Sequence, residues 1–306
     1  MKEISKEKLQ GVHGLVLTPF KENYEIDEEG LRKEIRVMVD NGVQVITPVG
    51  STGEFASLTI DEHKRVIEIA ADEVNGQALF IPGTSGASQK VVLDLIKFAK
   101  GVGADAVMVL PSYYYSILTD EAVYHWYKKL AQADTGIVIY NNPGLSKFNQ
   151  SPELLKRLAS LEHIVGIKEA HGNSIQFYKT LRMLGDKIPV LDGSGEIHGL
   201  EAILLGAAGF YSGVAGFVPK LSVRFYHVLK EGNLKEARRL SDLFEKFYNL
   251  CFLEGSCKMI AHYKAGFEYF GLGTSITRPP ILPISEEEKE KLFKVLSLLK
   301  DEEKKL

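Results

Sequence analysis

The chain has 306 residues, of which 45% are hydrophobic and 25% charged, as in an ordinary folded globular protein. These values exclude a disordered or a collagen-like chain. The 37 Lys and Arg residues against 40 Asp and Glu residues give a net charge of −3, so no basic excess predicts a nucleic-acid partner or an anionic membrane surface.

The N-terminal segment Met1–Glu7 is charged and lacks the apolar core of a signal peptide. No apolar run in the chain approaches the ~20 residues that a membrane span requires. We therefore expect a cytoplasmic protein without a membrane partner.

Eight short apolar runs alternate with amphipathic stretches along most of the chain. Near-continuous apolar runs are typical of parallel strands that are buried on both faces. The predicted strands are Val12–Leu17, Val45–Val49, Ala78–Ile81, Ala106–Leu110, Gly136–Tyr140, Ile164–Lys168, Pro189–Leu191 and Gly209–Ser212. The helices predicted after them are Asp27–Asp40, Ile60–Val74, Ser88–Gly101, Asp120–Ala133, Pro152–Ala159, Ser174–Leu184, Ile197–Leu205 and Pro219–Glu231.

The spacing of these runs favours a barrel. Strand starts lie 20 to 33 residues apart, the length of a strand–helix unit, and eight such units close a (β/α)8 TIM barrel. The main alternative is a doubly wound sheet. No G-x-G-x-x-G follows the first strand, where the chain reads Leu17-Thr18-Pro19-Phe20, which argues against that alternative.

Beyond residue 232 the predicted strands stop. Three helices are expected there, at Leu234–Leu253, Ser256–Phe270 and Ser285–Leu299. We predict a catalytic barrel over residues 1–232 and a C-terminal helical appendage over 233–306, without chemistry of its own. The two cysteines, Cys251 and Cys257, cannot form a disulfide framework and are expected to be buried thiols.

One lysine stands at the end of a predicted strand. Lys168 follows the apolar residues 164–167, and in barrel enzymes the ends of the strands carry the chemistry. Desolvation there lowers the pKa of the amine, which frees it to attack a carbonyl and form a Schiff base. The structural alternative is an ammonium group that pairs with Glu169 or extends to the rim.

Three further groups stand at strand ends. Tyr140 closes the preceding strand, where its hydroxyl could relay protons beside the lysine or simply serve packing. The loop Gly50–Glu54 presents consecutive backbone N–H groups that suit a carboxylate or a phosphate, unless it is a plain turn. The run Tyr113–Tyr115 suits an active site or a subunit interface.

No metal or nucleophile-elbow signature accompanies these groups. The histidines, including His171 and His198 on predicted loops, show no metal-ligand spacing, and no G-x-S-x-G is present. We expect no metal and no other cofactor, and we disfavour a metal-dependent aldolase and a serine hydrolase.

Five blocks occur in a specific order and spacing: Thr18–Phe20, Gly50–Glu54, Tyr140–Pro143, Gly166–Ala170 and Arg278–Pro283. Together they resemble the dihydrodipicolinate synthase / N-acetylneuraminate lyase family of class I Schiff-base enzymes, over nearly the whole chain. The resemblance implies a (β/α)8 barrel with a C-terminal helical domain, assembled as a dimer of dimers. It also implies that Tyr115, or else Tyr114, is offered across an interface to the neighbouring active site.

The resemblance implies roles for four residues by position. Lys168 resembles the Schiff-base lysine, and Tyr140 resembles the proton-relaying tyrosine. Ser51 and Thr52 match the pair that binds the carboxylate of a 2-keto acid. Ser51 also matches a member of the proton relay, with serine in place of the family threonine.

Residues that differ from the family pattern narrow the class of substrate that the chain is expected to accept. Leu145 stands where dihydrodipicolinate synthases carry an arginine for a second carboxylate, which an apolar side chain cannot replace. Leucine there resembles the lyases and sugar-acid aldolases, whereas Gly53–Thr59 resembles the keto-deoxy sugar-acid dehydratases. Gly195 replaces an aspartate of the lyase branch, so sialic acid is not supported. Glu196 and Ser212 fall where that branch binds substrate hydroxyls, and Gly193 and Tyr211 are further predicted substrate-binding residues.

These observations predict a cofactor-independent Schiff-base lyase that acts on a 2-keto acid. The first choice is an aldolase that cleaves a 2-keto-3-deoxy sugar acid or a similar compound and releases pyruvate. The alternatives are a dehydratase for such a sugar acid and a dihydrodipicolinate synthase, which Leu145 disfavours. From another class, a non-catalytic keto-acid sensor is opposed by the presence of both Lys168 and Tyr140.

Overall fold

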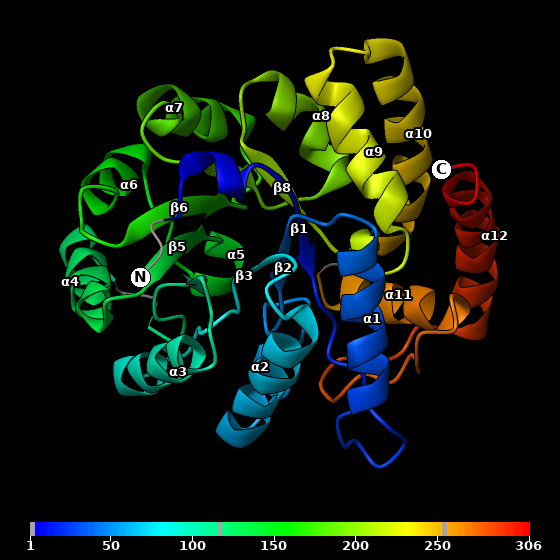
Figure 1. Ribbon diagram of the computed structural model, residues 1–306, viewed down its shortest axis with the longest axis horizontal. Helices are drawn as coiled ribbons and strands as arrows, with labels where there is room; N and C mark the ends of the chain where they lie inside the picture. Colours follow the sequence, from blue (N-terminus) through cyan, green and yellow to red (C-terminus); the bar gives the residue numbers. More distant parts are fainter. Residues whose placement is uncertain (1–3, 116–117, 253–255) are drawn as a thin grey trace.

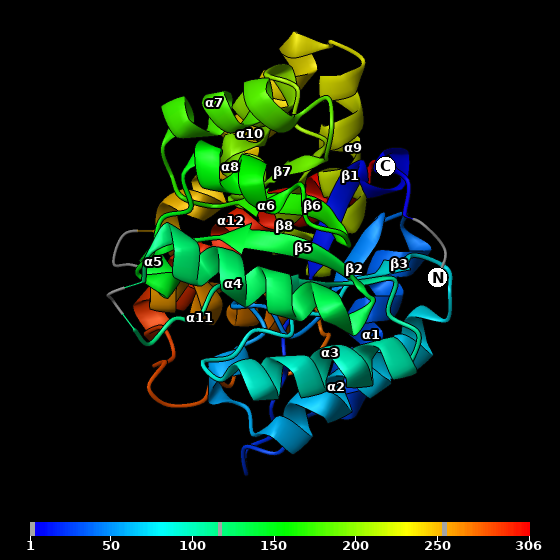
Figure 2. The same ribbon diagram turned by 90° about the vertical axis from the view of Figure 1, so that its left-hand side faces the viewer.

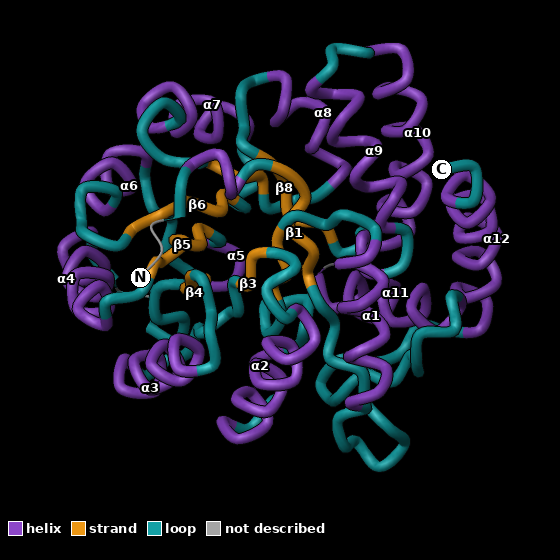
Figure 3. The backbone as a smooth tube through the Cα atoms, viewed as in Figure 1, coloured by secondary structure: helices purple, strands orange, loops and turns teal. Residues whose placement is uncertain are grey.

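The computed structural model describes residues 4–115, 118–252 and 256–306, and its strands form a ring (Figure 3). The strands are β1 (Gly11–Leu15), β2 (Val45–Thr47), β3 (Leu79–Phe80), β4 (Ala106–Val109), β5 (Gly136–Asn141), β6 (Ile164–Glu169), β7 (Val190–Asp192) and β8 (Gly209–Ser212). They pair in parallel in the order β3-β2-β1-β8-β7-β6-β5-β4. A parallel bridge between Gly83 and Met108 joins the two ends of this order. The expected (β/α)8 barrel is thereby confirmed.

Helices surround the ring (Figure 1, Figure 2). They are α1 (Glu28–Asp40), α2 (Ile60–Val74), α3 (Gln89–Gly101), α4 (Asp120–Leu130), α5 (Pro143–Ser146), α6 (Pro152–Leu158), α7 (Ser174–Leu184), α8 (Glu196–Leu204) and α9 (Pro219–Lys230). Short 3-10 helices span Lys6–Leu9, Phe55–Ser57, Ala131–Ala133 and Val214–Gly216.

The C-terminal appendage consists of α10 (Leu234–Cys251), α11 (Ser256–Tyr269) and α12 (Glu286–Glu303). Helices α10 and α12 pack against α9, and α10 also packs against α8. The expected end of the first helix, Leu253, lies outside the described residues. Cys251 is a buried free thiol, whereas the side chain of Cys257 lies outside the described residues. In the described part of the chain, no helix has both the length and the apolarity to cross a membrane.

Side chains of each strand alternate between two apolar layers. In β5, Ile137 and Ile139 belong to the outer layer against the helices, whereas Val138 and Tyr140 belong to the layer inside the barrel. Successive strand residues point to opposite faces, so each strand contributes to both layers. This double burial explains the continuous apolar runs. Other strands complete the inner layer with Leu15, Val45, Met108 and Leu191.

Two strands, β1 and β2, end two residues earlier than expected, at the edge where the candidate site lies. β1 stops before Leu17, because the N–H of that residue donates to both carboxylate oxygens of Glu34, at 3.1 Å each. β2 stops before Pro48, which has no N–H, and Val49, which has a φ of 57°. The chain therefore turns out of the sheet and into the loops sooner than the apolar pattern indicates.

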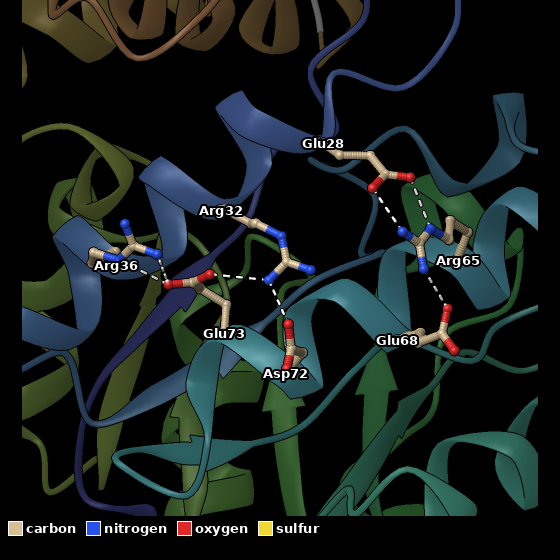
Figure 4. Close-up of polar contacts among 7 residues, drawn as sticks. All are labelled: Glu28, Arg32, Arg36, Arg65, Glu68, Asp72 and Glu73. Atoms are coloured by element: carbon tan, nitrogen blue, oxygen red, sulfur yellow. Dashed lines mark hydrogen bonds and ion pairs between the residues drawn. The ribbon is translucent and has the colours of Figure 1, made fainter.

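Ion pairs join the outer faces of α1 and α2 (Figure 4). Glu73 pairs with Arg36 and, at 3.1 Å, with Arg32, while Arg65 pairs with Glu28 at 2.7 Å. Pairs at a solvent-exposed surface contribute at most about 1 kcal/mol each. The apolar layers rather than these pairs therefore supply most of the stability of the barrel.

Candidate active site

Lys168 lies at the carboxyl end of β6, where its side chain enters the mouth of the barrel. Its Cα atom pairs with those of Tyr140 in β5 and Leu191 in β7, and both of these residues belong to the inner layer. Lys168 is 2% exposed. Its Nζ atom lies 4.1 Å from the ring centroid of Tyr140 and 4.2 Å from that of Tyr211. The amine is therefore held between two aromatic rings.

Burial lowers the pKa of the Lys168 amine, and the charges of Tyr140 and Asp192 act in the opposite direction. A lowered pKa favours the neutral amine, which is the nucleophile in imine formation. The alternative of a pair with Glu169 does not match the geometry. Glu169 follows Lys168 directly, so it points to the other face of β6, where it accepts a hydrogen bond from Asn141 Nδ2 at 2.9 Å.

Asn142 orients the hydroxyl of Tyr140. Its Nδ2 donates to Tyr140 Oη at 3.0 Å, and its Oδ1 accepts from the Leu145 N–H at 3.2 Å. Because the hydroxyl oxygen accepts this bond, its own proton stays free for donation. No motif in the sequence predicts this role of Asn142, although an asparagine followed by Pro143 is a recognisable start of a helix, here α5.

Ser51 and Thr52 lie in the loop that follows β2, on the same edge of the barrel as Lys168. The Ser51 Oγ atom is buried and has no hydrogen-bond partner among the described residues. The backbone N–H groups of Ser51 and Thr52 also donate to no atom in that part of the chain. Free donors of this kind suit a carboxylate.

The backbone of this loop is strained. Val49 and Glu54 have φ values of 57° and 55°, in the left-handed region that is unfavourable for β-branched residues in particular. The loop is also tightly packed: a Cβ atom on Gly53 would lie 2.9 Å from the carbonyl oxygen of Val16, and one on Gly83 would lie 2.3 Å from that of Val49. Such a conformation persists only where the surrounding structure holds it.

Two buried carboxyl groups lie on the face of the strands opposite to the Lys168 side chain, between the strands and the outer helices. Glu169 and Asp192 are Cα partners on β6 and β7. Burial is the main reason why the pKa of each is raised to about 7, and the charge of Asp192 contributes to the shift of Glu169. Both line a small cavity together with His171 and His198. Among the described side chains, no group of three His, Cys, Asp or Glu is arranged to hold a metal ion.

Tyr211 and Gly193, two of the residues expected to bind substrate, have different surroundings. Tyr211 lies beside Lys168, and its buried hydroxyl has no hydrogen-bond partner in the described ranges. The ring centroid of His13, a residue that no motif in the sequence indicates, lies 4.7 Å from that of Tyr211. Burial lowers the pKa of His13 to about 4, so it is neutral near pH 7. A Cβ atom on Gly193 would lie 2.4 Å from that of Ala170, which explains the glycine.

The structure does not bring Glu196 and Ser212 to the lysine. The Glu196 carboxylate is fully buried and accepts hydrogen bonds from Ser212 Oγ and Tyr248 Oη, each at 2.6 Å, and from Ser222 Oγ. Tyr248 and Ser222 belong to α10 and α9. Substrate binding by Glu196 and Ser212 stays a prediction, and these contacts with the outer helices argue against it.

The three consecutive tyrosines separate into two groups. Tyr113 packs against Phe55, beside the Ser51 loop, with ring centroids 5.9 Å apart. Tyr114 and Tyr115 are 78% and 58% exposed, and their rings meet edge to face at 5.5 Å. An exposed aromatic pair suits a subunit interface.

Known proteins share this architecture. The family model of the dihydrodipicolinate synthetase family matches residues 8–299. The 4-hydroxy-tetrahydrodipicolinate synthase of Pelobacter propionicus is 35% identical over 282 residues, which cover 92% of this chain and 95% of that protein. The dihydrodipicolinate synthase of Aquifex aeolicus is similar in structure, with a TM-score of 0.89 and 31% identity over 95% of this chain and 98% of that one. A dihydrodipicolinate synthase of Acinetobacter baumannii, solved with pyruvate, has a TM-score of 0.88 and 29% identity over 95% and 99% of the two chains.

Proposed function

This chain belongs to the dihydrodipicolinate synthetase family and is therefore a Schiff-base lyase, and we propose that it cleaves a 2-keto-3-deoxy sugar acid, or a similar 2-keto acid, to release pyruvate. The observation that carries this proposal is the placement of Lys168. Its amine is buried at the barrel mouth between Tyr140 and Tyr211, and burial lowers its pKa.

We infer that the reaction begins with the substrate carboxylate on the free N–H groups and hydroxyls of Ser51 and Thr52. The Lys168 amine then attacks the C2 carbonyl, and the resulting carbinolamine loses water to give an imine. Tyr140 supplies the proton with which the hydroxyl group leaves as water. The Ser51 hydroxyl, which has no partner among the described residues, is the second member of this relay.

Carbon–carbon cleavage follows from the charge of the protonated imine. A base removes the proton of the C4 hydroxyl, the C3–C4 bond breaks, and an aldehyde departs. The electron pair of that bond moves into the imine and leaves an enamine on Lys168. Protonation of the enamine at C3 and hydrolysis of the imine then release pyruvate and restore the amine. Tyr140 is the proposed carrier of the proton in these steps.

Leu145 favours this substrate class over a dicarboxylate. It is a residue of α5, the short helix that Asn142 caps, and it packs partly buried against the inner layer of the barrel. A second carboxylate at this point of the mouth would lack the charge-assisted hydrogen bonds that an arginine provides. Relatives of this chain are named synthases, so the synthase reaction is the second candidate to be tested.

We also propose that the chain assembles as a homotetramer in which Tyr115 reaches the active site of a neighbouring subunit. The exposure of Tyr114 and Tyr115 supports this arrangement, because solvent-exposed aromatic pairs are more typical of interfaces than of free surfaces. Sedimentation analysis of the purified protein should give about four times the chain mass of 34.0 kDa. A monomer in solution would contradict it.

The chemistry is tested by trapping the imine. The protein is incubated with pyruvate and borohydride, and the adduct is located by intact mass and peptide mapping. We expect a reduced pyruvyl adduct on Lys168, its loss in Lys168→Ala, and its retention in Lys147→Ala, which removes an exposed lysine of the same face. Lys168→Ala should also lower turnover by ~10³-fold or more. An unlabelled wild-type protein with a native circular dichroism spectrum would refute the proposal.

The substrate is tested separately. Pyruvate release from a panel of 2-keto-3-deoxy sugar acids is compared with the condensation of pyruvate and aspartate semialdehyde, on the same protein preparation. Faster turnover of aspartate semialdehyde would show that the lysine-forming synthase reaction, and not aldol cleavage, is the function. Loss of water from the sugar acid without release of pyruvate would identify the dehydratase.

A further inference from the structure

A second buried lysine lies far from Lys168 in sequence, in the C-terminal appendage. Lys264 of α11 is fully buried. Its Nζ atom donates to the carbonyl oxygen of Ile276 at 2.6 Å and lies 4.0 Å from the ring centroid of Phe20. Burial lowers its pKa to about 8, while the charge of Glu54 opposes this effect.

The partner of Lys264 is Glu54, the last residue of the loop that carries Ser51 and Thr52. The two side chains form an ion pair, and both are fully buried. Glu54 is also one of the two strained residues of that loop, with φ 55° and ψ 33°. Its other carboxylate oxygen accepts a hydrogen bond from the Arg278 N–H at 3.1 Å. The side chain of Glu54 is therefore fastened to the C-terminal part of the chain at both oxygens.

Arg278 binds residues that follow this loop in the chain. Its guanidinium group donates to the carbonyl oxygen of Ser57 at 2.9 Å and to Glu62 at 2.9 Å and 2.5 Å. Glu62 forms the capping box at the start of α2 together with Thr59. The stretch from Glu54 to Glu62 is thus attached at three of its residues, Glu54, Ser57 and Glu62, to residues that follow the barrel.

We propose that Lys264 is a positioning residue for the carboxylate-binding loop: through Glu54 it holds the N–H groups of Ser51 and Thr52 where the 2-keto acid binds. This proposal rests on the proposed function, because it assigns the C-terminal appendage a role in that same site.

The charges around Lys264 favour a positioning role over a purely stabilising one. Two buried carboxyl groups, those of Glu54 and Glu34, exert their charges on the amine. Removing such ions from water is costly, and an apolar replacement of a buried ion pair is often as stable. A close ion pair does, however, fix the relative orientation of the two side chains, and it holds Glu54 in a left-handed backbone conformation that a free loop would leave.

The test measures pyruvate binding and chemistry separately. Borohydride-trapped adduct is recorded against pyruvate concentration for the full-length wild type and for Lys264→Met, which removes the charge and keeps the length of the side chain. We expect the pyruvate concentration for half-maximal labelling to rise roughly tenfold or more, a shift typical for the loss of one positioned charge contact, whereas labelling at saturation stays complete because Lys168 is intact.

The matched control is Glu303→Gln. Glu303 also joins the appendage to the barrel, because it accepts hydrogen bonds from the N–H groups of Lys220 and Leu221. Neither of these contacts involves Glu54 or its loop. We expect this variant to lower the melting temperature and leave half-maximal labelling unchanged.

Each outcome bears on one proposal. A folded Lys264→Met protein with wild-type half-maximal labelling would overturn the positioning role and leave the Schiff-base chemistry intact. Should Lys264→Met fail to fold, the double variant Glu54→Gln/Lys264→Met removes both charges together and must show the same shift. Unchanged labelling of a folded double variant would equally overturn the role. Absence of an adduct in the wild type would instead refute the proposed function.

Discussion

At the scale of single residues, the contacts of Tyr140 decide how it can act. The hydroxyl group lies on the same edge as Lys168, and the amide of Asn142 donates to its oxygen at 3.0 Å. The amide carbonyl of Asn142 simultaneously caps α5. One side chain therefore has two functions, which substitution can separate because an aspartate keeps the acceptor but loses the donor.

We predict that Asn142→Asp folds with wild-type stability but loses about tenfold or more in kcat, because the carboxylate cannot donate to Tyr140 Oη and places a negative charge beside it. Half-maximal imine trapping by pyruvate should change little. Steady-state kinetics and thermal melts check this expectation. If Asn142 served only as a helix cap, Asn142→Asp would retain full activity while Asn142→Ala would be both less stable and less active.

At the scale of elements, the alternation of side chains along β6 and β7 separates reactive from structural groups. Lys168 and Leu191 face the barrel interior, and the next residues, Glu169 and Asp192, face the outer helices. The two carboxyl groups are buried and adjacent, so burial raises the pKa of each to about 7. Their ionisation therefore opposes folding.

This arrangement predicts a pH-dependent stability. Between the ordinary pKa of Glu169, near 4.5, and its raised value of about 7, the folded protein holds a proton that the unfolded chain loses. Stability therefore falls as the pH rises through this window, and the loss is complete above it. Glu169→Gln cannot ionise, so its unfolding free energy relative to wild type should increase by about 2–3 kcal/mol from pH 5 to pH 8.

Denaturant titrations at several pH values between 5 and 8 measure this difference. Glu153→Gln, at an exposed position of α6, is the control and should follow the wild type throughout. Parallel stability curves for Glu169→Gln and wild type would show that the Glu169 carboxyl is not held protonated in the folded state.

At the scale of the whole molecule, the barrel and the appendage share one apolar interior. The ring centroid of Phe247 in α10 lies 5.8 Å from that of Phe217, which follows β8, and 5.6 Å from that of Tyr263 in α11. Tyr248 of α10 also reaches across to Glu196. The predicted boundary between 1–232 and 233–306 therefore does not separate two apolar cores, and we propose that the two parts unfold together.

We predict that Phe247→Ala destabilises the protein by about 3–5 kcal/mol, as expected for a large cavity. The single tryptophan, Trp126, lies in α4 of the barrel and reports on the barrel alone, whereas far-ultraviolet circular dichroism reports on all helices. The unfolding midpoints measured by Trp126 fluorescence and by circular dichroism should shift equally. Leu298→Ala, at an exposed position of α12, should shift neither. A shift in circular dichroism without one in fluorescence would show that the appendage unfolds independently.

The sequence by itself determined the strand–helix order, the (β/α)8 class and the position of Lys168 and Tyr140 at strand ends. These features are local, because apolar periodicity and turn residues act over about ten neighbouring positions. Family blocks added Ser51 and Thr52 on the same basis, since each block is a short, contiguous segment.

Only the tertiary structure decided which distant groups meet. Glu196 was predicted to bind substrate, yet its carboxylate accepts hydrogen bonds from Ser222 of α9 and Tyr248 of α10. Lys264 looked like one of many helix lysines, but it pairs with Glu54, 210 positions earlier in the chain. No periodicity encodes such partners, because they depend on how helices pack around a closed barrel and on which buried charges must then be neutralised.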